Sequence, residues 1–402
     1  MGRFMVLVLD SFGIGYMDDV KEVRPQDIGA NTCKHILEKH PEVKLRNLEK
    51  LGLMNALGDN LGVMKKNEMA VFGISKLQHF GCDTFYGHQE IMGTLPQKPL
   101  TEAFSKSIDR VADTLKESGY EVEYKGNGPY YLLVNNSVAI GDNIEADLGQ
   151  AYNITASLDI VDFDEVTEIG KIVRKEVKVP RVIAFGGKNV NIEDILNAEE
   201  VKGDYIGINA PKSGVYNEGY KVIHLGYGVN PDVQIPTILG KNDIAVTLIG
   251  KVADIVHNQY GKSIFSVDTR EVMENMIKEM DNLHRGFMCV NVQETDLAGH
   301  RQNVEKYLEK LIITDVYMGR VIEKMNKEDI LVVMADHGND PTIGHSRHTR
   351  ENVPLLIYKK DIENKFIGHR KTLADVGATV AEYFNVEYPE NGQSFLHLIN
   401  DK

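Results

Sequence analysis

Three short apolar runs, each followed closely by an acidic residue, constrain the fold of this chain more than any other feature of its sequence. The runs and the acids that follow them are 4–9 with Asp10, 287–292 with Asp296, and 330–335 with Asp336. A continuous apolar run of this length is typical of a strand buried on both faces, as in a parallel sheet covered by helices. Because sites in open α/β sheets form at the carboxyl ends of strands, the three acids are candidates for one site.

The stretches between and beside these runs complete an α/β pattern. Apolar residues recur at helical spacing over 304–325, so a strand, a helix and a strand follow one another. A further strand is predicted over 244–249, and a further helix over 373–384. Asp315 falls on the apolar side of the helix predicted over 304–325, which indicates a buried, hydrogen-bonded acid or a local break.

The middle of the chain has a different pattern. Helices are predicted over 105–118 and 164–177, and strands over 130–134 and 181–185. We interpret this stretch as an α+β domain inserted into a larger α/β domain. The predicted organisation is a core domain in two parts, 1–97 and 223–402, with an inserted domain over 98–222.

The charge of the chain limits its partners. It carries 59 acidic and 45 basic side chains, a net charge of −14. This excess of carboxylates argues against a protein that coats nucleic acid or an anionic membrane, because neutralising phosphates requires clustered lysine and arginine. A chain of this charge that handles a small anion needs a local positive centre, from placed basic residues or bound metal ions.

The cysteines and the start of the chain indicate a cytoplasmic protein. Cys33, Cys82 and Cys289 are odd in number and far apart, without a CxxC pair. A disulfide framework and a thiolate zinc site are therefore not expected. The apolar start of the chain reaches Asp10 before it is long enough for a signal peptide or a membrane span.

The segment 335–351 has the residue types of a metal site. Asp336 and His337 directly follow a predicted buried strand, and His348 lies in the same loop. Carboxylate oxygens and imidazole nitrogens together suit Mn²⁺, Zn²⁺ or Mg²⁺. The alternative is a polar loop with surface histidines. Asp296 and His300 offer a second such pair, for which the alternative is a helix cap and an ordinary surface histidine.

Thr84 is the candidate nucleophile. Metal coordination can deprotonate a hydroxyl, and a helix N-terminus helps to hold an incoming phosphate. Two metals a few ångströms apart can clamp the attacking and leaving oxygens of a phosphoryl transfer. The alternatives are that Thr84 merely caps a helix, or that Cys82 is the nucleophile, although a packed thiol fits Cys82 better.

Several motifs together resemble the phosphopentomutases of the alkaline phosphatase superfamily, which also includes cofactor-independent phosphoglycerate mutases. The motifs are 8–15, Asp83-Thr84, Gly87-His88, 250–255, 335–342 and 348–351. The resemblance implies an α/β, alkaline-phosphatase-like doubly wound core sheet with an inserted α+β cap domain that closes over the site. It also implies a metal-dependent phosphomutase that acts on a small sugar phosphate.

The resemblance further implies two divalent ions, Mn²⁺ in the first place, with Mg²⁺ and Zn²⁺ as alternatives. One ion would be held by Asp10, Thr84, Asp336 and His337, and the other by Asp296, His300 and His348. Thr84 would carry the phosphate, give it to the bound sugar phosphate to form a bisphosphate, and take back the other phosphate. Lys251 would lie near the substrate phosphate.

The sequence departs from the family pattern at positions that bear on the substrate. Asp296 and His300 are four residues apart instead of five, Cys82 replaces a lysine, Phe185 replaces a cap arginine, and Asn136 replaces an aspartate. Our first hypothesis is conversion between the 1-phosphate and 5-phosphate of ribose or deoxyribose, or the corresponding reaction of a related small phosphorylated compound. The alternatives are a phosphatase, phosphodiesterase or phosphonate hydrolase on the same core, and a metal-bound sensor or structural subunit that has lost catalysis. The oligomeric state is left open.

Overall fold

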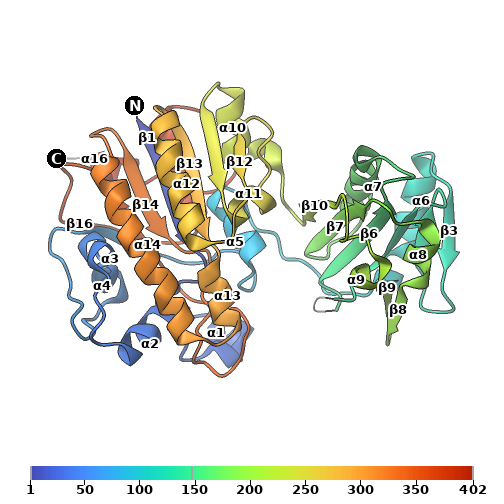
Figure 1. Cartoon of the computed structure of the whole chain (residues 1–402), viewed down its shortest axis with the longest axis horizontal. Coiled ribbons are helices and arrows are strands. Elements are labelled where there is room, and N and C mark those ends of the chain that lie inside the picture. The colour runs from blue at the N-terminus through green and yellow to red at the C-terminus, as the bar shows by residue number, and fades with distance from the viewer. Residues whose placement is uncertain (1, 146–147, 401–402) are drawn as a thin grey trace. The chain divides into compact units, whose positions relative to one another are not determined.

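The computed structural model describes residues 2–145 and 148–400, which form two compact units (Figure 1). Unit 1 consists of the chain up to Pro96 together with the chain from Asn230 onward, and unit 2 is Gln97–Val229. Each unit has hydrophobic clusters made of its own residues. None of the helices in the described residues combines the length and apolar character that crossing a membrane requires.

Unit 1 is an α/β structure. Its strands are β1 (Arg3–Leu9), β2 (Val71–Ser75), β11 (Ala245–Ile249), β12 (Lys262–Ile264), β13 (Gly286–Val292), β14 (Ile330–Met334), β15 (Val353–Tyr358) and β16 (Lys365–Arg370). Its helices are α1 (Val20–Val23), α2 (Thr32–Lys39), α3 (Arg46–Leu51), α4 (Leu53–Leu57), α5 (Thr84–Ile91), α10 (Ile235–Lys241), α11 (Lys251–Ile255), α12 (Thr269–Asn282), α13 (Glu294–His300), α14 (Val304–Lys324), α15 (Ala374–Phe384) and α16 (Leu396–Asn400).

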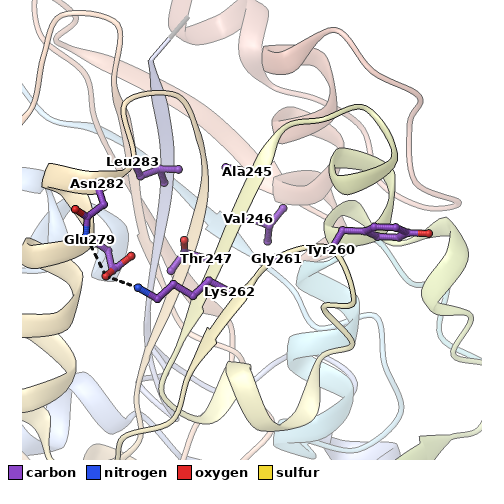
Figure 2. A pocket seen from close by; sticks show the side chains of 9 residues that line it. All are labelled: Ala245, Val246, Thr247, Tyr260, Gly261, Lys262, Glu279, Asn282 and Leu283. Atoms are coloured by element: carbon purple, nitrogen blue, oxygen red, sulfur yellow. Dashed lines mark hydrogen bonds and ion pairs between the residues drawn. The ribbon is translucent and has the colours of Figure 1, made fainter.

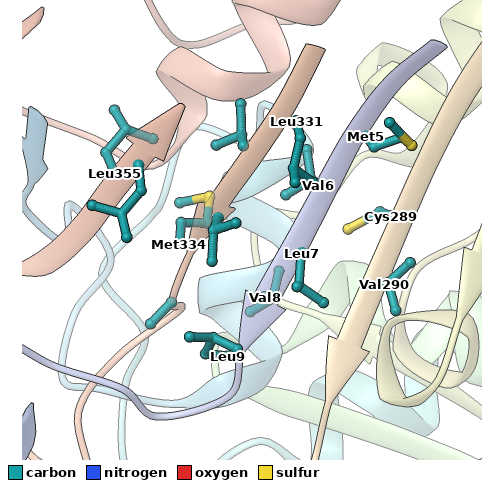
Figure 3. Close-up of a cluster of buried hydrophobic side chains, with 14 of the residues drawn as sticks. Met5, Val6, Leu7, Val8, Leu9, Cys289, Val290, Leu331, Met334 and Leu355 are labelled. Atoms are coloured by element: carbon teal, nitrogen blue, oxygen red, sulfur yellow. The ribbon is translucent and has the colours of Figure 1, made fainter. Parts of the chain in front are cut away.

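The described strands of unit 1 form one eight-stranded sheet, in the order β12-β11-β13-β1-β14-β15-β2-β16. β1 pairs in parallel with β13 and with β14, so that Val6 lies opposite both Cys289 and Val332. β15 runs antiparallel to its neighbours β14 and β2. In the close-up of Figure 3, β1 lies between β13 and β14. Its residues are buried on both faces, and each such apolar side chain contributes roughly 1.5–3 kcal/mol.

The helices of unit 1 pack in two groups. α12 and α14 contact each other and cover one face of the sheet in the view of Figure 1. In a second group, α15 contacts both α5 and α10. The predicted strands 4–9, 244–249, 287–292 and 330–335 are confirmed as β1, β11, β13 and β14, and the predicted helices 304–325 and 373–384 as α14 and α15.

Asp315 is a buried acid in the middle of α14, as the sequence predicted. Its carboxylate accepts hydrogen bonds from the backbone N–H of Asn47 at 3.0 Å and of Leu48 at 2.8 Å. These groups belong to the first turn of α3, whose own N-cap residue makes no side-chain hydrogen bond. Asp315 therefore caps α3 from another helix.

Unit 2 has an α+β structure. Its strands are β3 (Val122–Lys125), β4 (Tyr131–Val134), β5 (Val138–Asp142), β6 (Ala151–Ser157), β7 (Arg181–Gly187), β8 (Glu199–Lys202), β9 (Tyr205–Ile208) and β10 (Lys221–Gly226). Its helices are α6 (Ile108–Glu117), α7 (Phe163–Glu176), α8 (Ile192–Asn197) and α9 (Ala210–Ser213). Among the described residues, one sheet has the order β10-β7-β6-β5-β4-β3, and β8 and β9 form a separate pair.

The end of unit 2 differs from the boundary predicted at 222. β10 pairs antiparallel with β7, with Val222 opposite Phe185, so the whole of β10 belongs to the sheet of unit 2. The compact unit continues to Val229. The predicted boundary cuts this strand because the composition of a short edge strand does not indicate which sheet it joins.

A cavity of about 440 Å³ opens at the amino-terminal end of β11 (Figure 2). The carboxylate of Glu279 lies beside it and accepts hydrogen bonds from Lys262 at 2.8 Å and Asn282 at 3.3 Å. The side chains of Lys262, Glu279 and Asn282 thus satisfy one another. Lys251, a residue of the predicted site, lies just beyond the carboxyl end of β11. The cavity and the predicted site therefore lie at opposite ends of this strand.

Candidate metal centre

Two buried carboxylates lie together where two central strands end. Asp10 follows β1 and Asp336 follows β14, and these parallel strands place Val8 opposite Met334. Asp336 also accepts a hydrogen bond from the backbone N–H of Ser11 at 3.0 Å, which joins the two strand ends. Neighbouring buried carboxylates repel each other in a low-dielectric interior. The pair therefore favours a cation, or a proton, between them.

His337 completes the first group, whose ligand atoms lie within 4.8 Å of one another. His337 Nδ1 lies 2.9 Å from the carbonyl oxygen of Gly338 and donates its proton there, so Nε2 is the ring nitrogen that faces the two carboxylates. Nε2 lies 3.2 Å from Asp336 Oδ2 and 3.6 Å from Asp10 Oδ1, and neither Nε2 nor Asp10 Oδ1 makes a hydrogen bond within the described part of the chain. Two orphaned buried atoms of these types fit a divalent cation.

Thr84 is the first residue of α5, and its hydroxyl reaches this group. Asp83 is the N-cap, because its carboxylate accepts a hydrogen bond from the N–H of Phe85 at 3.0 Å. The Thr84 hydroxyl instead donates to Asp336 Oδ2 at 2.8 Å. A side chain at Gly87 would meet Asp336 at 2.8 Å, so glycine allows this close approach. The alternative that Thr84 is only a helix cap does not hold.

A second group of potential ligands lies on α13 and on the loop after β14. Asp296 and His300 are four residues apart on α13, on one face of the helix. His348 Nε2 lies 3.2 Å from Asp296 Oδ1 and 2.9 Å from His300 Nε2. Asp296 is buried, whereas the side chain of His300 is 41% exposed. The alternative of a helix cap beside an unrelated surface histidine does not describe this arrangement.

The two histidines of the second group have facing lone pairs. His300 Nδ1 lies 2.7 Å from the carbonyl oxygen of Ser346, and His348 Nδ1 lies 2.9 Å from that of Cys82. A carbonyl oxygen only accepts, so Nδ1 carries the proton in both rings. The two Nε2 atoms then repel each other unless a proton or a metal cation lies between them. Metal-binding histidines are commonly oriented in this way.

Lys251 connects the two groups. Its Nζ lies 3.2 Å from Asp10 Oδ2 and 3.4 Å from Asp296 Oδ2, one carboxylate from each group. Burial alone would lower the pKa of Lys251, but the carboxylates of Asp10 and Asp296 raise it above its ordinary value. The ammonium group is therefore a fixed positive charge within the centre, with a side chain that is 13% exposed.

The charges in the first group depend on one another. Burial and the neighbouring Asp336 raise the pKa of Asp10 to about 6. Burial also acts to raise the pKa of Asp336, but His337 and His88 hold it well below its usual range. Burial alone would lower the pKa of His337, yet Asp336 raises it to about 10. A divalent cation would take the place of these protons, so metal binding is expected to weaken as the pH falls.

Two asparagines that orient the ligands were not predicted from the sequence. Asn291 Nδ2 donates to Asp10 Oδ2 at 3.1 Å and contacts His88 Nε2 at 2.9 Å. Asn339 Nδ2 donates to Asp296 Oδ1 at 3.0 Å. The available signal was a polar side chain within a buried apolar strand, which is the position of Asn291 in β13.

His88 organises the start of α5 through contacts with Thr84 and Asp336. Its Nδ1 lies 2.9 Å from the carbonyl oxygen of Thr84 and 3.2 Å from Asp336 Oδ2. Because Asn291 contacts the other ring nitrogen through a donating amide, Nδ1 carries the proton that faces these acceptors.

The departures from the family pattern lie in different places. Cys82 is buried, and burial raises the pKa of its thiol to about 12, so it is a packed group and a poor nucleophile. Phe185 is buried in unit 2, with its ring 5.9 Å from that of Tyr216 and 6.1 Å from that of Tyr220. Asn136 lies in the turn between β4 and β5 with a φ of 49°.

Buried carboxylates and oriented histidines at the carboxyl ends of an α/β sheet define a metal-dependent enzyme. A family model described as the Metalloenzyme superfamily matches residues 2–388. Phosphopentomutase from Caldanaerobacter subterraneus subsp. tengcongensis is 31% identical to this chain, over 98% of this chain and 97% of its own length. Phosphopentomutase from Kosmotoga olearia is 30% identical, over 99% and 100% respectively. The chain therefore belongs to the phosphopentomutase family.

Among solved structures, phosphoglycerate mutase from Leishmania mexicana, determined at low cobalt concentration, aligns with a TM-score of 0.42 and 11% identity. It covers 98% of this chain and 97% of its own. Membership of the metalloenzyme superfamily, together with the two groups of potential ligands, makes divalent metal binding a property of this chain.

Proposed function

We propose that the chain interconverts the 1-phosphate and 5-phosphate of ribose or deoxyribose through a phosphate carried on Thr84. The reaction class is supported by relatives that match over almost the whole chain and are phosphopentomutases. The observation that carries the residue assignment is the Thr84 hydroxyl, which begins α5 and donates to Asp336 at 2.8 Å. A hydroxyl held in a cluster of metal-ligand groups can be activated as a nucleophile.

The two groups give the proposed ligand sets. Asp10, Thr84, Asp336 and His337 would hold one ion, and Asp296, His300 and His348 the other. The orphaned Asp10 Oδ1 and His337 Nε2 atoms support this proposal. Oxygen and imidazole ligands favour Mn²⁺, with Mg²⁺ and Zn²⁺ as alternatives. When bound, such ions supply positive charge to the phosphoryl oxygens and make a bound hydroxyl more acidic.

The residues of the chain have distinct roles in this proposal. Asp336 orients the Thr84 hydroxyl, and the positive end of the α5 dipole favours a phosphate at Thr84. Phosphorylated Thr84 transfers its phosphoryl group to the free hydroxyl of the sugar phosphate, so one P–O bond breaks and another forms. The resulting bisphosphate returns its other phosphoryl group to Thr84. Lys251 exchanges contacts with Asp10 and Asp296 for a contact with the substrate phosphate.

Further properties follow from the same proposal. The partner is a small phosphorylated sugar, and unit 2 is the cap domain of the family. A cytoplasmic location agrees with the three cysteines, which are free and buried. The hydrolase alternatives are not favoured, since the full-length relatives are mutases.

The conversion of ribose 1-phosphate to ribose 5-phosphate by Mn²⁺-loaded protein tests the proposal. We expect conversion by the wild type, and loss of at least about a thousandfold in Thr84→Ala, since removing a nucleophile removes its whole reaction path. Thr114→Ala, at a half-buried threonine on α6, is the matched control and should keep wild-type activity. Absence of conversion by the loaded wild type would contradict the pentose assignment, and release of inorganic phosphate would favour a hydrolase.

A further inference from the structure

A partly buried ion pair outside the two ligand groups contacts the loop that carries His348. Arg24 directly precedes the short 3₁₀ helix Pro25–Asp27, and its Nε donates to Asp27 Oδ2 at 2.6 Å. The side chain of Asp27 is fully buried, and that of Arg24 is 20% exposed. A buried carboxylate is costly unless it is paired and hydrogen-bonded, so the groups around Asp27 hold one another in place.

The pair reaches the loop on both sides of His348. Arg24 Nη2 donates to the carbonyl oxygen of His348 at 2.9 Å. Asp27 Oδ2 accepts a hydrogen bond from the backbone N–H of Arg350 at 2.9 Å. These two contacts fix the backbone at His348 and two residues beyond it.

A third contact lies before His348. His345 Nε2 lies 3.3 Å from Asp27 Oδ1. His345 Nδ1 accepts a hydrogen bond from the N–H of Arg347 at 3.3 Å, so Nε2 carries the proton and faces the carboxylate. The side chain of Asp27 therefore contacts the loop on both sides of His348.

The loop needs such contacts because it lacks regular structure of its own. Residues 335–352 form turns, bends and isolated bridges between β14 and β15. The ring of His348 is oriented by the carbonyl oxygen of Cys82 at 2.9 Å, and its backbone is held by Arg24. Together these contacts set the position of His348 Nε2 relative to Asp296 and His300.

We propose that Arg24 and Asp27 are positioning residues that set the affinity of the group Asp296, His300 and His348 for its metal ion. This inference rests on the proposed function, in which His348 is a metal ligand. Asp10 and Asp336 follow paired strands of the central sheet and do not depend on the loop backbone at His348. Loss of the ion pair should therefore weaken the binding of one ion and leave the other nearly unchanged.

Calorimetric titration of metal-free, full-length protein with Mn²⁺ tests this inference. We expect two ions in the wild type, and in Arg24→Met a loss of affinity of about 10–100-fold for one ion, the range typical of residues that orient metal ligands. Lys21→Met, at an exposed lysine on α1, removes the same charge three residues away and should bind both ions as the wild type does. Arg24→Lys should recover part of the affinity, because an ammonium cannot make both guanidinium contacts at once.

Hydrogen exchange of the Arg350 amide in the metal-free protein gives a second readout. Its exchange should accelerate in Arg24→Met and in Asp27→Asn, and stay unchanged in Lys21→Met. If Arg24→Met does not fold, the Mn²⁺ titration is done on Asp27→Asn, because asparagine keeps the shape of the aspartate side chain and removes its charge.

Wild-type affinity for both ions in Arg24→Met and Asp27→Asn would overturn the inference, and so would an equal loss for both ions. A wild type that binds fewer than two ions would instead overturn the two-metal proposal itself. The number of ions bound by the wild type therefore distinguishes failure of the proposed function from failure of this inference.

Discussion

At the level of single residues, the protonated Nδ1 atoms of three histidines decide what the centre holds. His300, His337 and His348 each direct Nδ1–H at a backbone carbonyl, which turns their Nε2 lone pairs toward buried carboxylates. Together, these Nε2 atoms and carboxylates repel an anion and attract a divalent cation. A chain with a net charge of −14 can thus act on a phosphate, because in the proposed centre some of its acids would bind the cations that the phosphate needs.

Cys82 is expected to be unreactive although it lies two residues before Thr84. Burial raises the pKa of its thiol to about 12, so at pH 9 roughly one molecule in a thousand carries the thiolate. Ellman's reagent should therefore modify Cys82 much more slowly in native protein than in urea, as peptide mass mapping can measure. Cys82→Ser should keep activity within about a factor of two. Rapid modification of native protein, or a large loss of activity, would contradict the packed role.

The buried carboxyl group of Asp142 should make the stability of unit 2 depend on pH. Its buried carboxylate accepts hydrogen bonds from the N–H of Phe104 and Ile206, and burial raises its pKa from 3.8 to about 6. The folded state then holds this proton more tightly than the unfolded state. The contribution of Asp142 to the free energy of unfolding should fall as the pH rises from about 4 to above 6, by up to about 3 kcal/mol.

The asparagine in Asp142→Asn cannot ionise and keeps an accepting oxygen. The variant should therefore lack the pH-dependent contribution of Asp142 to the free energy of unfolding. Urea unfolding of variant and wild type at pH 4.5 and pH 7 measures the effect. The variant should gain stability relative to the wild type at pH 7, and a difference that is the same at both pH values would show that Asp142 does not titrate in this range.

At the level of elements, the sequence predicts where buried strands occur but not how they run. β1, β13 and β14 are recognisable because their apolar runs are continuous, a property of the strand itself. The antiparallel direction of β15 depends on the loop 335–352, which returns the chain beside β14. The membership of β10 in the sheet of unit 2 depends on its pairing with β7, which its own residues do not reveal.

The candidate site was predictable to a similar extent. Asp10, Asp296 and Asp336 could be found because a charged ligand type directly follows a buried run. Asn291 could not be assigned, because an amide has no metal-ligand signature and its partners are fixed only by the fold. The contact of Arg24 with His348 joins residues 324 positions apart, which local patterns do not encode.

Asp315 should stabilise unit 1 through the cap that it provides to α3. Asp315→Ala leaves the N–H groups of Asn47 and Leu48 without this acceptor, and we expect a loss of about 1–2 kcal/mol in the free energy of unfolding. Chemical denaturation measures this loss. Glu323→Ala, at an exposed acid on the same helix, should change stability by less than about 0.5 kcal/mol. Equal effects of the two substitutions would contradict the cap.

At the level of the whole molecule, the described residues form two units with separate cores, and the candidate metal centre lies in unit 1. The sheet of unit 1 brings together potential metal ligands that come from distant parts of the sequence. The hydrophobic clusters of unit 2 consist of residues within Gln97–Val229. Metal binding and the stability of unit 2 should therefore be separable.

Scanning calorimetry of the full chain should resolve two transitions. Addition of Mn²⁺ at about 100 times its Kd should stabilise the unit that carries the centre by about 2.7 kcal/mol per ion and leave the other transition in place. Removal of the metal with EDTA should reverse the shift. A single transition, or an equal shift of both, would contradict independent cores.

The central claim is that Thr84 carries the phosphate that moves within the sugar phosphate. The most direct measurement is transfer of radioactive phosphate from protein labelled at Thr84 to unlabelled ribose 1-phosphate, with the labelled peptide identified by mass. We predict that the label leaves Thr84 and appears in ribose bisphosphate and ribose 5-phosphate, in Mn²⁺-loaded protein and not in Thr84→Ala. Label that appears as inorganic phosphate alone, or protein that converts the sugar phosphate without ever carrying label on Thr84, would contradict the account.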